Sequence, residues 1–117
     1  MDGNLGHVTR VLVVDDEPQV ARALSTALTQ AGYDVVVAAD GTHGVELAAS
    51  AEPDLMILDM SMPGVDGLEV IRRVRPWLTA PILVLSGVAQ ERHKVAALDA
   101  GADDYLQKPF GLDELHA

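Results

Sequence analysis

Five short apolar runs recur along the chain, separated by polar residues and helix-like segments. Each run is continuous rather than alternating, which is typical of strands covered on both faces, as in a parallel sheet. The runs are Val11 to Val14, Val35 to Val37, Leu55 to Leu58, Ile82 to Leu85 and, more weakly, Tyr105-Leu106. The pattern therefore predicts five strands of one parallel sheet.

Helical periodicity fills the first two intervals between these runs. In residues 18 to 31, apolar side chains recur at three- and four-residue steps, with Pro18 suited to the first turn and Gly32 to the end of a helix. Apolar positions between residues 45 and 49 indicate a shorter second helix, which ends before Pro53. Both intervals are therefore expected to cross from one strand to the next through a helix.

The later intervals follow the same rule. Asp66 and Glu69 have the spacing of a capping box, which predicts a third helix that runs to Pro76. A fourth helix is expected to break near Gly101, and residues 111 to 117 have the pattern of the first turns of a fifth. The apolar positions that indicate the fourth helix are Val95, Leu98 and Ala102.

The alternation of strands and helices predicts an α/β fold. Five strand–helix units with right-handed crossovers fit either an open doubly wound sheet or part of a barrel, and a chain of 117 residues favours the open sheet. The composition, 49% apolar and 22% charged, is that of one ordinary domain. We expect a polar leader over residues 1 to 9 and one domain over residues 10 to 117, with its last helix incomplete.

Charge and cysteine content narrow the range of functions. The chain has no cysteine, which excludes disulfides, thiolate metal sites and cysteine nucleophiles. Its net charge of -10 predicts that this chain alone binds neither nucleic acid nor anionic membranes. The sequence shows no membrane span and no secretory signal pattern, so we expect a cytoplasmic protein.

Polar side chains follow four of the five predicted strands. In an open α/β sheet, ligands bind beyond the carboxyl ends of the strands. Asp15-Asp16-Glu17 follows the first run, Asp59 the third, Ser86-Gly87 the fourth and Lys108-Pro109 the fifth. The sequence therefore predicts a functional site at this edge of the sheet.

The acidic residues indicate the chemistry of this site. A nucleotide-binding loop would carry glycines after the first strand, and no such motif occurs in the sequence. Carboxylates that converge repel one another unless a cation lies among them. Oxygen ligands without sulfur or histidine favour Mg²⁺, with Mn²⁺ as a substitute, and Mg²⁺ commonly binds a phosphoryl oxygen as well.

Such a site suits phosphoryl transfer to a carboxylate. Asp59 is the candidate nucleophile because it follows the third strand, which we expect to be central, whereas Asp15 and Asp16 are better placed to hold the metal. Lys108 would contact the phosphoryl group as a positive charge, and the hydroxyl of Ser86 would contact it as a hydrogen-bond donor.

Taken together, these residues make the chain resemble the receiver domain of two-component response regulators. The residues that carry the resemblance are Asp15-Asp16, Asp59, Ser86, Tyr105 and Lys108-Pro109. The acid pair, Asp59, Ser86 and Lys108-Pro109 each lie at their own strand end. The resemblance covers residues 10 to 115 and implies a flavodoxin-like sheet with strand order 2-1-3-4-5. It also implies that a sensor histidine kinase donates a phosphoryl group to Asp59.

The resemblance assigns metal-binding roles within the acidic loop regions. Asp16 and Asp59 would bind Mg²⁺ directly, and Asp15 would act mainly through water. The backbone carbonyl of Ser61 would complete the set of protein ligands. The product would be an aspartyl phosphate that the domain itself slowly hydrolyses, which makes it a signalling phosphoacceptor rather than a turnover enzyme.

The resemblance also assigns residues that respond to the phosphoryl group. Ser86 would turn toward it, and Tyr105 would move inward behind Ser86. A cis peptide bond between Lys108 and Pro109 would aim the lysine.

The segment from Lys94 to Phe110, KVAALDAGADDYLQKPF, is similar to receivers of the subfamily that carries a winged-helix DNA-binding domain. Members of this subfamily dimerise through the fourth helix, the fifth strand and the fifth helix. The resemblance places Lys94, Asp104 and Glu114 on that face of a homodimer, with Lys94 and Glu114 as an ion pair. It implies control of transcription as the output, with DNA binding in a further domain.

Alternatives from other classes stay open. One is a Mg²⁺-dependent small-molecule phosphohydrolase, although enzymes with an aspartate nucleophile generally carry a second acid two residues later, where this chain has Ser61. Another is a docking module that is not phosphorylated. Asp15 and Asp16 would also suit simple capping of the first helix, but one cap needs only one residue.

Overall fold

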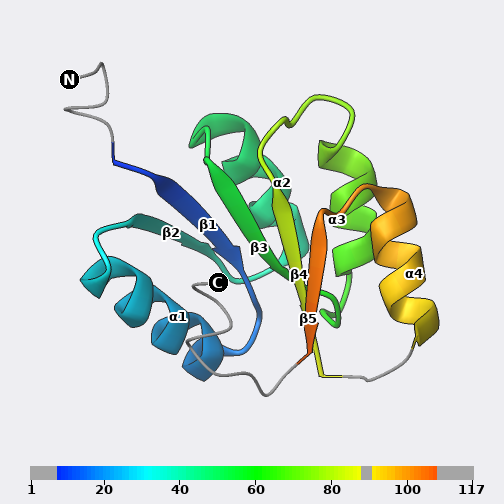
Figure 1. The fold of residues 1–117 in the computed structure, drawn as a ribbon, viewed down its shortest axis with the longest axis horizontal. Helices are drawn as coiled ribbons and strands as arrows, with labels where there is room; N and C mark the ends of the chain where they lie inside the picture. The colour runs from blue at the N-terminus through cyan, green and yellow to red at the C-terminus, as the bar shows by residue number, and fades with distance from the viewer. Residues whose placement is uncertain (1–7, 88–90, 108–117) are drawn as a thin grey trace.

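Strands and helices alternate through the whole of the computed structural model, which describes residues 8–87 and 91–107 (Figure 1). The strands are β1 (Arg10–Val14), β2 (Asp34–Ala38), β3 (Leu55–Asp59), β4 (Ile82–Ser86) and β5 (Asp104–Gln107). The helices are α1 (Pro18–Gln30), α2 (Gly41–Ser50), α3 (Gly67–Val74) and α4 (Glu91–Ala100). The sequence pattern thus predicted every one of these elements, and the expected fifth helix lies outside the described residues.

The strands form one parallel sheet in the order β2-β1-β3-β4-β5. This order confirms the open, doubly wound sheet implied by the resemblance. In a parallel sheet all strands end at the same edge, and the arrowheads in Figure 1 accordingly gather at one side of the molecule. Four positions were expected to form the site. The described part of the chain contains three of them: the loop after β1, Asp59 at the end of β3 and Ser86 at the end of β4.

Local sequence signals explain where the helices begin and end. The side chain of Asp66 accepts a hydrogen bond from the backbone N–H of Glu69 at 3.0 Å, as the predicted capping box requires. The side chain of Asp40 caps α2 in the same way, through the N–H of His43 at 2.8 Å. After α1, Gly32 adopts a φ of 99°, a left-handed conformation that glycine adopts without steric cost.

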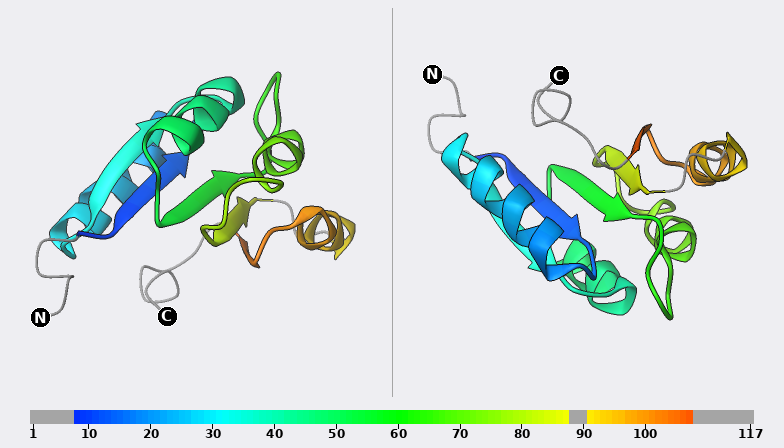
Figure 2. Two further views of the ribbon diagram at one scale, coloured as in Figure 1. Left: turned by 90° about the horizontal axis from the view of Figure 1, so that it is seen from above. Right: turned by 90° about the horizontal axis from the view of Figure 1, so that it is seen from below.

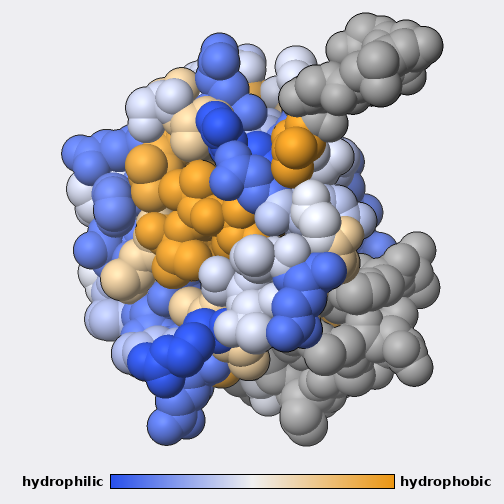
Figure 3. Space-filling model, turned by 90° about the vertical axis from the view of Figure 1, so that its left-hand side faces the viewer, coloured by the Kyte–Doolittle hydropathy of each residue, from blue (hydrophilic) through white to orange (hydrophobic). Residues whose placement is uncertain are grey.

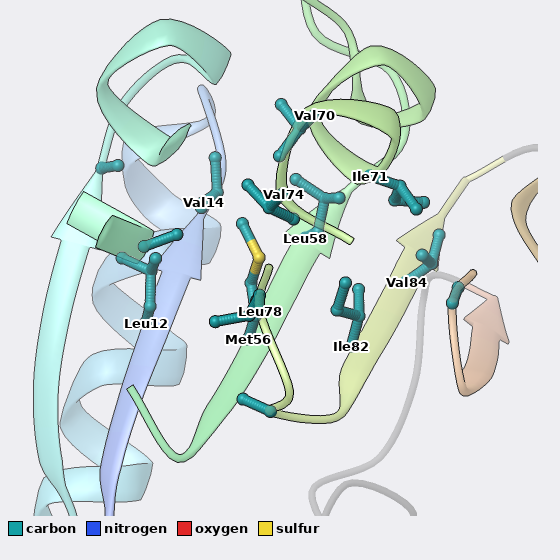
Figure 4. Close-up of a cluster of buried hydrophobic side chains, with 14 of the residues drawn as sticks. Leu12, Val14, Met56, Leu58, Val70, Ile71, Val74, Leu78, Ile82 and Val84 are labelled. Carbon is teal, nitrogen blue, oxygen red and sulfur yellow. The ribbon is translucent and has the colours of Figure 1, made fainter. Parts of the chain in front are cut away.

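Alternate residues along the strands supply two separate cores. On one face of the sheet, Val11, Val13, Ile57 and Leu85 pack against Leu24 and Leu28 of α1. On the other face, the side chains of Leu12, Val14, Met56, Leu58, Ile82 and Val84 pack against α2, α3 and α4 (Figure 4). The views in Figure 2 show the helices on the two faces of the sheet. The continuous apolar runs of β1, β3 and β4 therefore arise because successive residues face a core on opposite sides of the sheet.

The apolar face predicted for the fourth helix is wrong in detail. Val95 and Leu98 are 49% and 37% exposed, whereas Ala97 is fully buried. Val95 and Leu98 lie three residues apart and share one face of the helix, while Ala97 is rotated from Leu98 by about 100°. The small side chain of Ala97 lets α4 approach the core closely, and the two larger apolar residues are left at the surface.

No helix within residues 8–87 and 91–107 has the length and hydropathy needed to cross a bilayer. The longest of them, α1, has 13 residues.

The start of α3 packs directly on the end of β3. A Cβ atom added to Gly67 would lie 2.6 Å from the backbone oxygen of Asp59 and 2.7 Å from the Cα atom of Met60. Both distances are shorter than real side chains adopt. Glycine at position 67 therefore lets α3 support the strand end that carries Asp59.

We expect Gly67→Ala to lower the free energy of unfolding by about 1–3 kcal/mol, because the added methyl group overpacks this contact. Urea unfolding of both chains measures the difference. Gly87→Ala is the matched control, since an added Cβ there has no neighbour within 4 Å. Equal losses in the two variants would contradict the close approach of α3 to β3.

Candidate functional site

Acidic and hydroxyl side chains meet at the carboxyl ends of the central strands. Asp15 directly follows β1, and Asp59 and Ser86 are the last residues of β3 and β4. The register aligns Val14 of β1 with Leu58 of β3, and Asp59 with Leu85 of β4. Asp15 and Asp59 thus lie at the same level of the sheet, and Ser86 lies one residue further along.

Three carboxylates form one group at this edge. Asp15, Glu17 and Asp59 each offer an oxygen, and these oxygens lie within 4.8 Å of one another. Asp15 and Asp59 are each only 2% exposed, whereas Glu17 is exposed. Two carboxylates are therefore held almost out of solvent, with a third at the open side of the group.

Backbone amides fix one oxygen of each buried carboxylate. Oδ1 of Asp15 accepts the N–H of Glu17 at 2.9 Å, and Oδ1 of Asp59 accepts the N–H of Ser61 at 3.2 Å. The N–H of Met60 donates to the carbonyl oxygen of Leu85 at 2.9 Å, which extends the pairing of β3 with β4 past Asp59. The backbone thus orients both aspartates before any ligand is present.

The geometry fits a small divalent cation with oxygen ligands. Oxygens around Mg²⁺ are about 3.0 Å apart when adjacent and about 4.2 Å apart when opposite, so three oxygens within the observed separation can converge on one ion by side-chain rotation. Without a cation, buried carboxylates at this spacing repel one another in a medium that screens charge poorly. The donor set of Asp15, Glu17 and Asp59 therefore suits Mg²⁺ or Mn²⁺.

Glu17 is the member of this group that the sequence interpretation left without a role. It occupies the N-cap position of α1 with an extended backbone (φ −91°, ψ 108°), and its side chain forms no capping hydrogen bond. The carboxylate of Asp15 accepts the N–H of Glu17. Helix capping thus does not account for Glu17, and the only sequence signal for this residue was its place beside Asp15-Asp16.

Asp16 lies beside the group but is not a member of it. It is half-buried and, with Asp15, lines one end of a groove of about 350 Å³ between α1 and the outer strand β2. Val37 and Ala39 line the same groove, and Val37 is 39% exposed. Figure 3 shows the apolar area on this side of the molecule.

The other expected site residues take different positions. Ser86 is fully buried at the end of β4, and Ser61 is exposed in the loop after β3. Tyr105 is half-buried in β5, where it pairs with Val84 of β4. Lys108 and Pro109, and with them the expected cis peptide bond, lie outside the described residues.

The expected dimer residues are partly described. Lys94 in α4 and Asp104 at the start of β5 are exposed, as an interface between copies requires. Their companion Glu114 lies outside the described residues. The exposed side chains of Val95 and Leu98 lie on the same helix as Lys94 and add apolar surface there.

Related sequences place these features in a known family. Residues 11–117 match the model of the response regulator receiver domain. The transcriptional regulatory protein KdpE of Mycobacterium tuberculosis is 51% identical over 110 residues, covering 94% of this chain and 49% of the relative. The KDP operon transcriptional regulatory protein KdpE of Escherichia coli is 50% identical over 110 residues, again covering 94% and 49%. The chain therefore spans about half the length of these curated relatives.

Solved structures agree with the sequence relatives. A response regulator from Chloroflexus aurantiacus, described as putative, is 40% identical and superimposes with a TM-score of 0.87, covering 93% of this chain and 92% of that one. The chemotaxis protein CheY4 of Vibrio cholerae is 34% identical, with a TM-score of 0.88 and 93% of both chains covered. With its sheet order, its acidic edge and these similarities, the chain belongs to the response regulator receiver domain family.

Proposed function

We propose that this domain accepts a phosphoryl group on Asp59 and thereby acts as a phosphorylation-controlled switch. The observation that supports this most directly is the group of three carboxylates in which Asp59 ends the central strand β3. Asp59 is nearly excluded from water, and a backbone amide fixes one of its oxygens. Its second oxygen is the candidate nucleophile toward phosphorus.

The proposed transfer requires a donor with a labile phosphoryl bond, for which a sensor histidine kinase is the expected source. An oxygen of Asp59 attacks phosphorus, a new P–O bond forms, and the P–N bond to the kinase histidine breaks. Bound Mg²⁺ would neutralise negative charge on the transferring oxygens. Asp15, Glu17 and Asp59, together with Asp16 and the carbonyl of Ser61, are the residues that would hold it.

Ser86 and Lys108 are proposed to receive the phosphoryl oxygens, with Tyr105 as the residue that responds behind them. The position of Ser86 at the end of β4, next to β3, supports its part in this proposal. The aspartyl phosphate would be hydrolysed slowly by the domain itself, which limits the duration of the signal. Control of transcription through a further domain is the proposed output, because the curated relatives are named as transcriptional regulators.

Removal of divalent metal is expected to destabilise the parent chain. At a Mg²⁺ concentration about 100 times the Kd, binding adds about 2.7 kcal/mol to the free energy of unfolding. Asp59→Asn is expected to lose most of this gain and to be more stable than the parent in EDTA, because one repelling charge is gone. Thermal unfolding with and without Mg²⁺ measures both effects.

Asp99→Asn is the matched control, since Asp99 is an exposed acid in α4 away from the carboxylate group. It should respond to Mg²⁺ as the parent does. A parent chain whose melting temperature is the same in EDTA and in millimolar Mg²⁺ would contradict the metal site.

Incubation with acetyl phosphate and Mg²⁺ is expected to add one phosphoryl group to the parent and none to Asp59→Ala. Intact-mass spectrometry measures the gain, and Asp99→Ala should behave as the parent does. Modification that persists in Asp59→Ala would assign the acceptor elsewhere. Sustained turnover of a generic phosphate ester would instead favour the small-molecule phosphohydrolase.

The homodimer is proposed to use the face that carries Lys94, Val95, Leu98 and Asp104. We expect Leu98→Asp to weaken self-association of the phosphorylated chain by about tenfold or more, because it buries a charge in an apolar contact. Sedimentation analysis measures the dissociation constant. Val37→Asp is the control, because Val37 is an exposed residue of β2, the outer strand farthest from β5. An equal effect of both variants would argue against this face.

A further inference from the structure

Arg75 links three segments at the amino ends of the strands, on the side of the sheet away from the acidic site. It follows α3, and its guanidinium group donates to the carbonyl oxygens of Leu78, Ala80 and Gly101, the last two at 2.9 Å. It also contacts the carboxylate of Asp103 at 3.2 Å, and its own side chain is 24% exposed. One half-buried cation thus joins the end of α3, the approach to β4 and the turn between α4 and β5.

Asp103 continues this link into the sheet. Its carboxylate accepts the N–H of Ile82 at 2.8 Å, and its own N–H donates to the carbonyl oxygen of Ile82 at 2.8 Å. Ile82 is the first residue of β4, and Asp103 directly precedes β5. The two strands are therefore joined by a pair of hydrogen bonds before their ladder begins.

The strand that Asp103 precedes is short and only partly buried. β5 has four residues and lies at the end of the strand order, with β4 as its partner. Its side chains at Tyr105 and Leu106 are only half-buried. A slip of one residue would shift the strand by about 3.3 Å and exchange its two faces, and weakly buried strands resist such slips poorly.

The register of β5 matters for the proposed phosphoacceptor site. Ser86 is aligned with Gln107, the last residue of β5, and Lys108 follows Gln107 in the chain. The pairing of β5 with β4 therefore sets where Gln107 lies relative to Ser86. Neither Arg75 nor Asp103 belongs to the acidic site, which lies at the other ends of these strands.

We propose that Arg75 and Asp103 form a register clamp, which fixes β5 against β4 and so holds Gln107, the last residue of β5, in place beside Ser86 at the candidate site. Both are positioning residues, and the inference rests on the proposed function of Asp59. Gly101 belongs to the same arrangement: it adopts a φ of 123°, and a Cβ there would lie 2.5 Å from the side chain of Arg75. A side chain at residue 101 would therefore collide with Arg75 in its present position.

Asp103→Ala is expected to slow phosphorylation of Asp59 by acetyl phosphate about tenfold or more, since misplacement of about 1 Å is enough for such losses. Its affinity for Mg²⁺ should stay within about twofold of the parent value, because β1 and β3 carry the carboxylate group. Asp103→Asn should stay within about threefold of the parent rate, since its amide oxygen still accepts the N–H of Ile82. Intact-mass time courses and calorimetric Mg²⁺ titration supply the two values, and Asp99→Ala is the control.

Hydrogen exchange tests the clamp independently of phosphorylation. The amides of Ile82 and Asp103 should exchange at least about tenfold faster in Asp103→Ala than in the parent, because both hydrogen bonds depend on this residue or its position. Arg75→Met is a second variant that leaves the bonds between Asp103 and Ile82 in place. It should also slow phosphorylation without changing Mg²⁺ affinity, and it decides the question if Asp103→Ala does not fold.

Three results would overturn the inference: equal rates in Asp103→Ala and Asp103→Asn, a fall of Mg²⁺ affinity in step with the rate, or Arg75→Met with the parent rate. The first two would indicate a role in stability alone. A parent chain that takes up no phosphoryl group would instead refute the proposed function, which separates the two failures.

Discussion

Electrostatic repulsion between carboxylates is the constraint on which the arrangement of this domain depends. Asp15 and Asp59 are each 2% exposed, and Glu17 joins them within 4.8 Å. A core of two apolar layers alone would not bring these charges together, because burial disfavours the charges of Asp15 and Asp59 and proximity disfavours the whole group. A divalent cation would reverse the sign of the interaction, so that acids which oppose the folded state without metal would hold a ligand once metal is bound.

The parallel sheet supplies the geometry for this site at little cost elsewhere. Its strands are apolar on both faces, so polar groups are confined to the strand ends, and parallel strands bring those ends to one edge. Backbone amides then orient the aspartates, while Gly67 allows α3 to pack against the strand that carries Asp59. At the opposite edge, Arg75 and Asp103 connect α3, α4 and β5 to β4. The apolar cores and the candidate site thus lie at different places along the same strands.

Much of this could be predicted from the sequence, because its signals are local. Continuous apolar runs located the strands, Asp66 and Glu69 located the start of α3, and the residues after β1 and at the ends of β3 and β4 located the site. The exposure of Val95 and Leu98 was missed, since periodicity indicates a helix face but not which face meets the core. Whether Glu17 joins the carboxylate group depends on the direction of its side chain within one loop. The contact of Arg75 with Asp103 joins residues 28 positions apart. Neither leaves a pattern in the sequence that spacing alone would reveal.

One divalent ion is proposed to bind among the carboxylates of residues 15, 17 and 59. Mn²⁺ is the most direct probe, because it substitutes for Mg²⁺ and broadens the NMR signals of nearby nuclei. Substoichiometric Mn²⁺ should broaden first the amide signals of residues 14–17 and 58–61, and excess Mg²⁺ should restore them. Broadening centred on exposed acids at the opposite edge, such as Asp34 and Asp54, or no selective broadening at all, would contradict the account.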